Sequence, residues 1–63
     1  MPMTSREMIK LLRENGFIII NQTGSHVKLR NYISGRQVIV PFHSKTLKKG
    51  LEHAILKQAG LSL

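Results

Sequence analysis

The stretch of residues 26–32 limits the fold more than any other part of the sequence, because its side chains alternate strictly between polar and apolar. Successive side chains of a strand point to opposite faces, so Val27 and Leu29 share one face. The opposite face carries His26, Lys28, Arg30 and Tyr32. The alternation therefore predicts a strand in a sheet that is covered on one side and open on the other.

Two further segments predict partner strands. Residues 17–21 are short and β-branched, and the polar, glycine-containing residues 22–25 after them are typical of a turn. Residues 34–35 mark a second turn, and residues 37–41 form a third strand. Pro41 ends that strand, because proline has no N–H to donate to a ladder.

An amphipathic helix is predicted over residues 4–14. Thr4 followed by Glu7 is a capping box, in which each residue satisfies a free N–H of the other. Gly16 ends the helix in the left-handed conformation. The apolar residues that recur at helical spacing are Met8, Leu11 and Leu12.

A second helix is predicted over residues 47–59, with Thr46 as its N-cap and Gly60 as its stop. Residues 42–45 form the loop that leads to it. The stripe expected to face the core consists of Leu47, Leu51, Ala54, Ile55 and Gln58.

The order of elements is therefore helix, three strands and helix within 63 residues. A chain of this length buries about 60% of its unfolded surface, so it forms one domain with a small core. Two amphipathic helices can cover one face of a three-stranded antiparallel sheet in two layers. We predict a single α+β domain over residues 1–63 whose second sheet face stays open.

The charge of the chain is strongly positive, with ten Lys and Arg against three Glu and a formal net charge of +7 at pH 7. This excess favours a nucleic acid as partner, because each cation set against a phosphate releases a counterion. Three scattered carboxylates do not build the clustered ligands of a two-metal nuclease. We therefore expect no metal and no other cofactor.

Cysteine is absent from the sequence. Its absence excludes disulfides, Cys-type zinc sites and thiol catalysis, and it suits a reducing cytoplasm. The longest apolar run, residues 17–20, is far shorter than the roughly twenty residues of a membrane span. We expect a cytoplasmic protein with no membrane partner.

The sequence Gly24-Ser25-His26 places an imidazole where a turn enters a strand, and the turn N–H groups can receive a phosphate oxygen. An imidazole takes and returns protons near neutral pH. Lys28 and Arg30 follow on the same face and are candidates to hold phosphates. The arrangement suits metal-free RNA cleavage, in which a base deprotonates a ribose 2′-hydroxyl that attacks the adjacent phosphate. His26 is the candidate catalytic residue.

Further basic side chains are secondary candidates. His43, just after the third strand, is a possible auxiliary acid or base, although a loop histidine is often only structural. The proton for the leaving 5′-oxygen has three possible sources, namely His43, Lys28 or water. Lys45, Lys48 and Lys49 gather at the start of the second helix, where they serve either solubility or a grip on phosphate.

The same residues resemble a known family. The matching segments, in the family's order, are Ser5-Arg6-Glu7, Ile9, Leu11-Leu12, Gly16-Phe17, Gly24-Ser25-His26, Val38-Ile39-Val40-Pro41, His43, Leu47, Lys49-Gly50 and residues 55–60. Together they resemble the HicA toxins, the mRNA interferases of HicA–HicB toxin–antitoxin systems. The family often carries a proline where this chain has Lys48.

The resemblance implies a fold like that of double-stranded-RNA-binding domains and an endoribonuclease that cleaves mRNA with its histidine at His26. It also implies a HicB antitoxin that covers the active site and, as a complex with the toxin, binds operator DNA. The residues by themselves leave two other functions open. One is an RNA-binding domain that does not cut, and the other is a module that binds an acidic protein.

Overall fold

The computed structural model describes residues 3–43 and 45–61. Within these residues the elements are α1 (Ser5–Glu14), β1 (Ile18–Thr23), β2 (His26–Arg30), β3 (Gln37–Pro41) and α2 (Lys49–Ala59). The strands form one antiparallel sheet in the order β1-β2-β3. The predicted α+β fold, with helix, three strands and helix, is confirmed.

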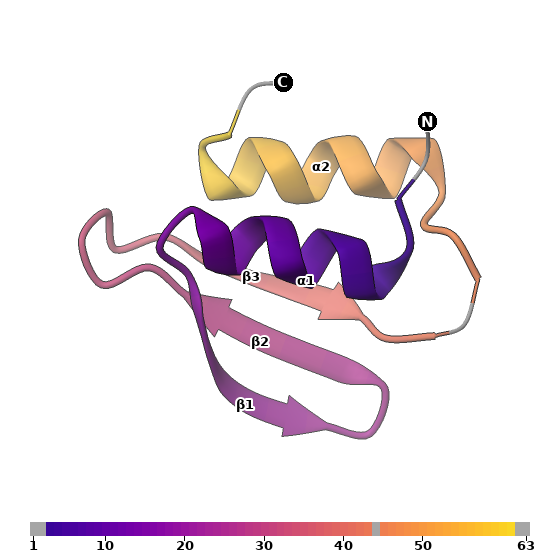
Figure 1. Ribbon diagram of the computed structural model, residues 1–63, viewed down its shortest axis with the longest axis horizontal. Helices are drawn as coiled ribbons and strands as arrows, with labels where there is room; N and C mark the ends of the chain where they lie inside the picture. The colour runs from indigo at the N-terminus through magenta and orange to yellow at the C-terminus, as the bar shows by residue number, and fades with distance from the viewer. Residues whose placement is uncertain (1–2, 44, 62–63) are drawn as a thin grey trace.

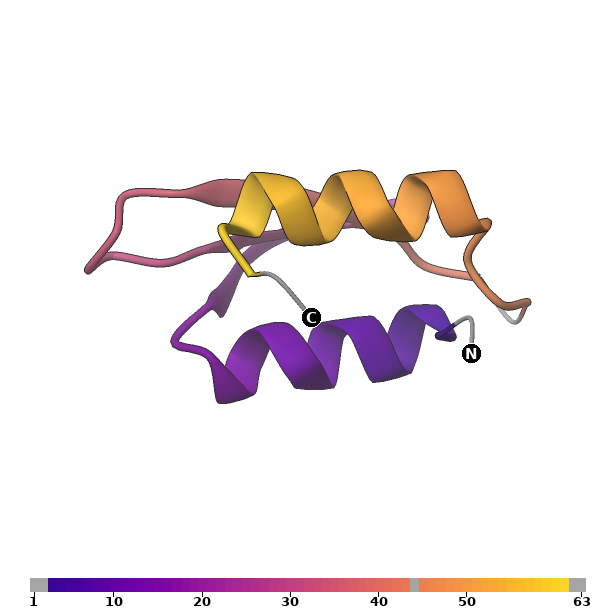
Figure 2. The ribbon, with the colours of Figure 1, turned by 90° about the horizontal axis from the view of Figure 1, so that it is seen from above.

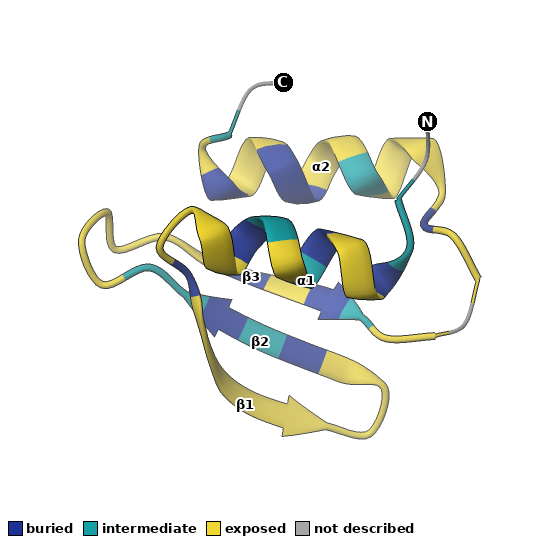
Figure 3. Cartoon of the chain, viewed as in Figure 1, coloured by how far each residue is buried: buried dark blue, intermediate teal, exposed yellow. Residues whose placement is uncertain are grey.

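The helices and the sheet enclose one core. α1 crosses in front of the sheet and α2 runs beside β3 (Figure 1), and the view from above separates α1 from the sheet (Figure 2). Buried positions lie on β2, on β3 and on both helices (Figure 3). The core cluster consists of Met8, Leu12, Phe17, Val27, Leu29, Val38, Val40, Leu47, Ile55, Leu56 and Ala59. Both helices thus contribute to the covering of one sheet face.

The start of α1 has the predicted capping box. The Thr4 hydroxyl accepts a hydrogen bond from the Glu7 N–H at 3.1 Å, and the Thr4 N–H donates to the Glu7 carboxylate at 2.8 Å. The bond from the Thr4 backbone, with that from its side chain, holds the pKa of Glu7 below its ordinary value of 4.5. Gly16 follows the helix with φ +93°, so the predicted left-handed glycine is also confirmed.

The hairpin between β1 and β2 is tighter than the sequence predicts. β1 continues to Thr23, and Gln22 and Thr23 pair with β2, so their assignment to a turn was wrong. Gly24 and Ser25 form the whole turn, with a positive φ at Gly24 only. That is the pattern of a type II′ turn, whose twist matches the flanking strands.

β2 is shorter than predicted, because it ends at Arg30 and Tyr32 lies in a turn. Asn31 closes that turn. Its side-chain oxygen accepts hydrogen bonds from the N–H groups of Ile33 and Ser34, at 2.9 and 3.1 Å. A short polar side chain that binds its own backbone in this way competes with the sheet ladder.

The predicted start of α2 was also wrong. Thr46 is not an N-cap but pairs with Thr4 in an isolated β-bridge, and the Leu47 N–H donates to the Met3 carbonyl at 2.8 Å. Lys48 is the N-cap and makes no side-chain capping bond. The predicted loop of residues 42–45 includes Ser44, which lies outside the described residues.

The core-facing side of α2 differs from the predicted stripe. Ile55 is buried as expected, and Leu47 is buried in the segment before the helix. Leu51, Ala54 and Gln58 are exposed, whereas Leu56 and Ala59 are buried instead. α2 is less amphipathic than α1, so contacts with β3 rather than local periodicity set its rotation.

Candidate functional site

The open face of the sheet carries the predicted polar residues of β2 in cross-strand rows. His26 lies between Thr23 of β1 and Pro41 of β3. Lys28 lies in the next row of that face, between Asn21 and Ile39. Val27 and Leu29 point to the core between them, at 2% and 0% exposure. The alternation of β2 is therefore confirmed, and it brings the imidazole and the ammonium group to one face.

These two rows surround a shallow hollow of about 160 Å³. Its lining residues are Asn21, Thr23, His26, Lys28 and Ile39. Asn21 and Thr23 add an amide and a hydroxyl that the sequence-based site did not include. The missed signal was the length of β1, because a strand that runs to the Gly24 turn must place both residues beside β2.

The β1–β2 turn fixes where His26 begins its strand. Gly24 has φ +57°, a conformation that costs a side-chain-bearing residue energy, although a Cβ there would meet no atom within 4 Å. The Phe42 N–H donates to the Ser25 carbonyl, so the end of β3 holds the far side of the turn. Gly24 and Ser25 are both exposed and adjacent to the hollow in sequence.

Arg30 does not join this hollow. It lies four residues beyond His26 on the same face, about 13 Å along the strand. Its guanidinium lies 5.3 Å from the centre of the Tyr32 ring, and it donates to the Gln37 side chain at 3.3 Å. The structure thus separates Arg30 from the other two polar residues of β2 and gives it partners of its own.

His43 lines a different hollow. That hollow, of about 430 Å³, is formed by Thr4, Arg6, Phe42 and His43 at the start of α1. The fully buried Ser5 holds this segment, because its hydroxyl donates to the Pro41 carbonyl at 2.6 Å and accepts from the His43 N–H at 3.3 Å. Ser5 was not predicted as a site residue.

The three predicted lysines lie at one end of the molecule. Lys45, Lys48 and Lys49 are exposed, in the segment that leads from β3 into α2. Both helix N-termini, the β1–β2 turn and the end of β3 lie at this same end (Figure 1). None of the three lysines lines the hollow that contains His26.

The acidic residues serve the helices rather than the open face. No acidic residue occurs between Glu14 and Glu52, so all three strands and their turns lack a negative charge. Glu7 caps α1, and the Glu52 carboxylate accepts the Met3 N–H at 2.6 Å. Within residues 3–43 and 45–61, no three His, Asp or Glu side chains gather as metal ligands. The open face is therefore cationic.

Comparison with known families matches residues 5–61 to the family described as HicA toxin of bacterial toxin-antitoxin. The chain belongs to the HicA toxin family. The resemblance seen in the motifs is thereby confirmed over nearly the whole chain. HicA toxins pair with HicB antitoxins, so a toxin–antitoxin system is the setting of this fold. No curated protein matches the chain. Within the described residues, no helix is long and apolar enough to cross a bilayer.

Proposed function

We propose that this HicA chain is an RNA endonuclease that needs no metal ion and uses His26 as its general base. One observation carries the proposal: His26 and Lys28 line the same hollow on a sheet face without acidic residues. A cationic, acid-free hollow suits a phosphodiester, and an imidazole in it suits proton transfer. A ribonuclease also explains why the chain needs an antitoxin.

In the proposed reaction, His26 removes the proton of a ribose 2′-hydroxyl, and the 2′-oxygen attacks the adjacent phosphorus. The bond from phosphorus to the 5′-oxygen breaks, which leaves a 2′,3′-cyclic phosphate and a 5′-hydroxyl. Lys28 stabilises the charge on the phosphorane and supplies the proton to the leaving 5′-oxygen. DNA lacks the 2′-hydroxyl and is not cleaved by this route.

Lys28 is a better proton donor in this scheme than His43. Lys28 shares the hollow with His26, whereas His43 belongs to the hollow beside Thr4 and Arg6. Gly24 and Ser25 are proposed to approach the phosphate with their backbone. Arg30, Lys45, Lys48 and Lys49 are proposed to bind more distant parts of the RNA backbone, with mRNA as the substrate in the cytoplasm.

The test is cleavage of a defined single-stranded RNA by the purified chain, free of antitoxin, with and without EDTA. We expect cleavage in both conditions, products that end in a 2′,3′-cyclic phosphate, and no cleavage of the matching DNA. His26→Ala should lower the rate about 10²–10⁴-fold, the usual contribution of a general base. His53→Ala is the matched control, because His53 is exposed on α2 and should leave the rate unchanged.

Two results would contradict the proposal. If wild-type protein binds the RNA but leaves it intact, the chain is a binding domain for RNA and not a nuclease. If His26→Ala and His53→Ala cleave equally well, His26 is not the base. Circular dichroism of both variants shows that each is folded before the rates are compared.

A further inference from the structure

The outer edge of β1 exposes a run of large apolar side chains. Ile18, Ile19 and Ile20 are 50%, 43% and 39% exposed, although isoleucine is normally buried. β1 is an edge strand, so one side of it has no neighbouring strand within the described residues. Exposed, apolar edge strands are sites where another chain pairs or packs.

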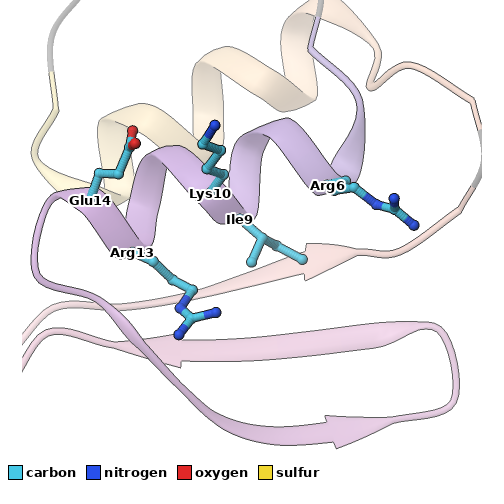
Figure 4. Close-up of a pocket in the computed structure, with 5 residues that line it drawn as sticks. All are labelled: Arg6, Ile9, Lys10, Arg13 and Glu14. Carbon is cyan, nitrogen blue, oxygen red and sulfur yellow. The ribbon is translucent and has the colours of Figure 1, made fainter.

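One flank of α1 combines an apolar side chain with cations. Arg6, Ile9 and Arg13 project from one side of the helix, and Lys10 and Glu14 from the other (Figure 4). These residues line a hollow of about 510 Å³. The arginines thus stand on either side of Ile9 along the helix, at a spacing of three and four residues.

Ile19 lies on the same side of the sheet as α1. It pairs with the core residue Leu29, so it lies on the helix-covered face of the sheet, and it remains 43% exposed. Ile9 packs against the core from α1, and α1 contacts β1 directly. Ile18 pairs with Arg30 and therefore lies on the open face, so the exposed isoleucines form an apolar strip around the edge of β1 that reaches both faces of the sheet.

Three observations decide what binds this strip. The isoleucines offer nothing to phosphates, so a nucleic acid gains little here. A net charge of +7 opposes the pairing of two copies. The arginines of α1 complement carboxylates. The chemistry fits a protein segment with apolar and acidic side chains, and an antitoxin is the partner that the family supplies.

We propose that the outer edge of β1 and the Arg6–Arg13 flank of α1 bind an extended, acidic and apolar segment of the HicB antitoxin. Such a segment adds a strand to β1 on one side of its bulge near Ile20, places apolar side chains on the isoleucines, and sets carboxylates against the two arginines. Asn21 and Thr23 of β1 also form one wall of the His26 hollow. Bound antitoxin therefore lies beside that hollow, and the importance of this position for cleavage rests on the proposed function.

The first experiment measures the affinity of the HicB antitoxin encoded with this chain, by calorimetry, in the His26→Ala background so that no RNA cleavage interferes. The double variant Ile18→Thr with Ile20→Thr keeps β-branched side chains and removes apolar surface. We expect its Kd to rise about a hundredfold. Ile33→Thr is the control, because Ile33 is 96% exposed in the β2–β3 loop and its Kd should not change.

The second experiment tests the charges. The pair Arg6→Gln with Arg13→Gln should raise Kd about tenfold and weaken its dependence on salt. The pair Arg36→Gln with Lys57→Gln removes the same charge from the β2–β3 loop and from α2, neither of which lines the hollow on α1, and should change Kd much less. Equal effects of the two pairs would mean that net charge alone attracts the antitoxin, and would overturn the assignment of the flank.

Hydrogen exchange of the complex then tests strand addition. We expect backbone amides of residues 18–21 to exchange more slowly when the antitoxin is bound. Unchanged exchange at β1, together with full affinity of the double isoleucine variant, would overturn the proposal. These readouts measure binding and not cleavage, so a chain that fails to cut RNA would leave the docking result intact and refute only the proposed function.

Discussion

The two faces of β2 show how one strand serves two purposes. Val27 and Leu29 face the helices and are almost fully buried, whereas His26 is exposed and Lys28 is partly exposed on the opposite face. The core packs around each buried side chain, whereas the side chains of the open face are not packed against other elements. Alternate residues of one strand therefore contribute to stability and to the proposed chemistry. Substitutions on the buried face should change the stability, and substitutions on the open face should change RNA cleavage.

The largest effect is expected on the covered face. Leu29 is 0% exposed, so Leu29→Ala leaves a cavity in a small core and should reduce the free energy of unfolding by about 2–5 kcal/mol. In a domain of this size such a loss removes most of the stability. Urea unfolding followed by circular dichroism measures it. A loss below about 1 kcal/mol would show that the core can collapse around the missing side chain.

Ser5 joins the two layers and should come next. Its buried hydroxyl bonds to the Pro41 carbonyl and the His43 N–H at the end of β3. Ser5→Ala leaves both groups without this partner and should lower the free energy of unfolding by about 1–3 kcal/mol. Ser34→Ala, in an exposed loop, is the control and should cost about 1 kcal/mol or less. Equal losses would mean that water replaces the Ser5 hydroxyl.

Much of the fold was predictable because local patterns carry it. The capping box of α1, the alternation of β2 and the bounds of β3 depend on a few neighbouring residues, and all three are confirmed. The start of α2 was not predictable in this way. The bridge of Thr46 with Thr4 joins residues 42 positions apart, and no local pattern reports such a contact.

The candidate site was predictable to the same extent. The alternation alone predicted that His26 and Lys28 lie on one face, but it gave Arg30 the same predicted role in phosphate binding as Lys28. Only the structure shows that Arg30 is held by Tyr32 and Gln37. Asn21 and Thr23 line the hollow because the bulge and the short turn set the register of β1 against β2. This register depends on the pairing of the two strands and cannot be predicted from the residues of β1 alone.

On the open face, Lys28→Gln should leave the free energy of unfolding within about 0.5 kcal/mol of the wild type, because the side chain is outside the core. RNA cleavage should slow by about 10²–10⁴-fold, because Lys28 is the proposed proton donor to the leaving 5′-oxygen as well as a charged contact to phosphate. The plot of log affinity against log salt should become shallower by about 0.7, the value for one phosphate of a single strand. An unchanged salt slope would show that Lys28 makes no contact with an RNA phosphate.

The smallest effect is expected from Glu7, whose carboxylate belongs to the helix layer. Its pKa is held below the ordinary value of 4.5 by the hydrogen bonds with Thr4, so the folded state favours the charged form. The stabilisation is fully present above pH 4.5 and is lost as the pH falls through the lower pKa of the folded state. Urea midpoints measured from pH 6 to pH 3 should therefore fall less for Glu7→Gln than for the wild type.

Glu14→Gln is the matched control for this titration, because Glu14 lies on the same helix and takes no part in the capping box. The urea midpoint should fall less with falling pH for Glu7→Gln than for Glu14→Gln, because only Glu7 has its carboxylate in the capping box. Equal pH dependence of the two variants would mean that the capping box does not couple folding to protonation. RNA cleavage at neutral pH should be the same in both variants, because the carboxylates stabilise α1 and the hollow contains none. A change in cleavage with Glu7→Gln alone would show that the two faces of the sheet are not independent.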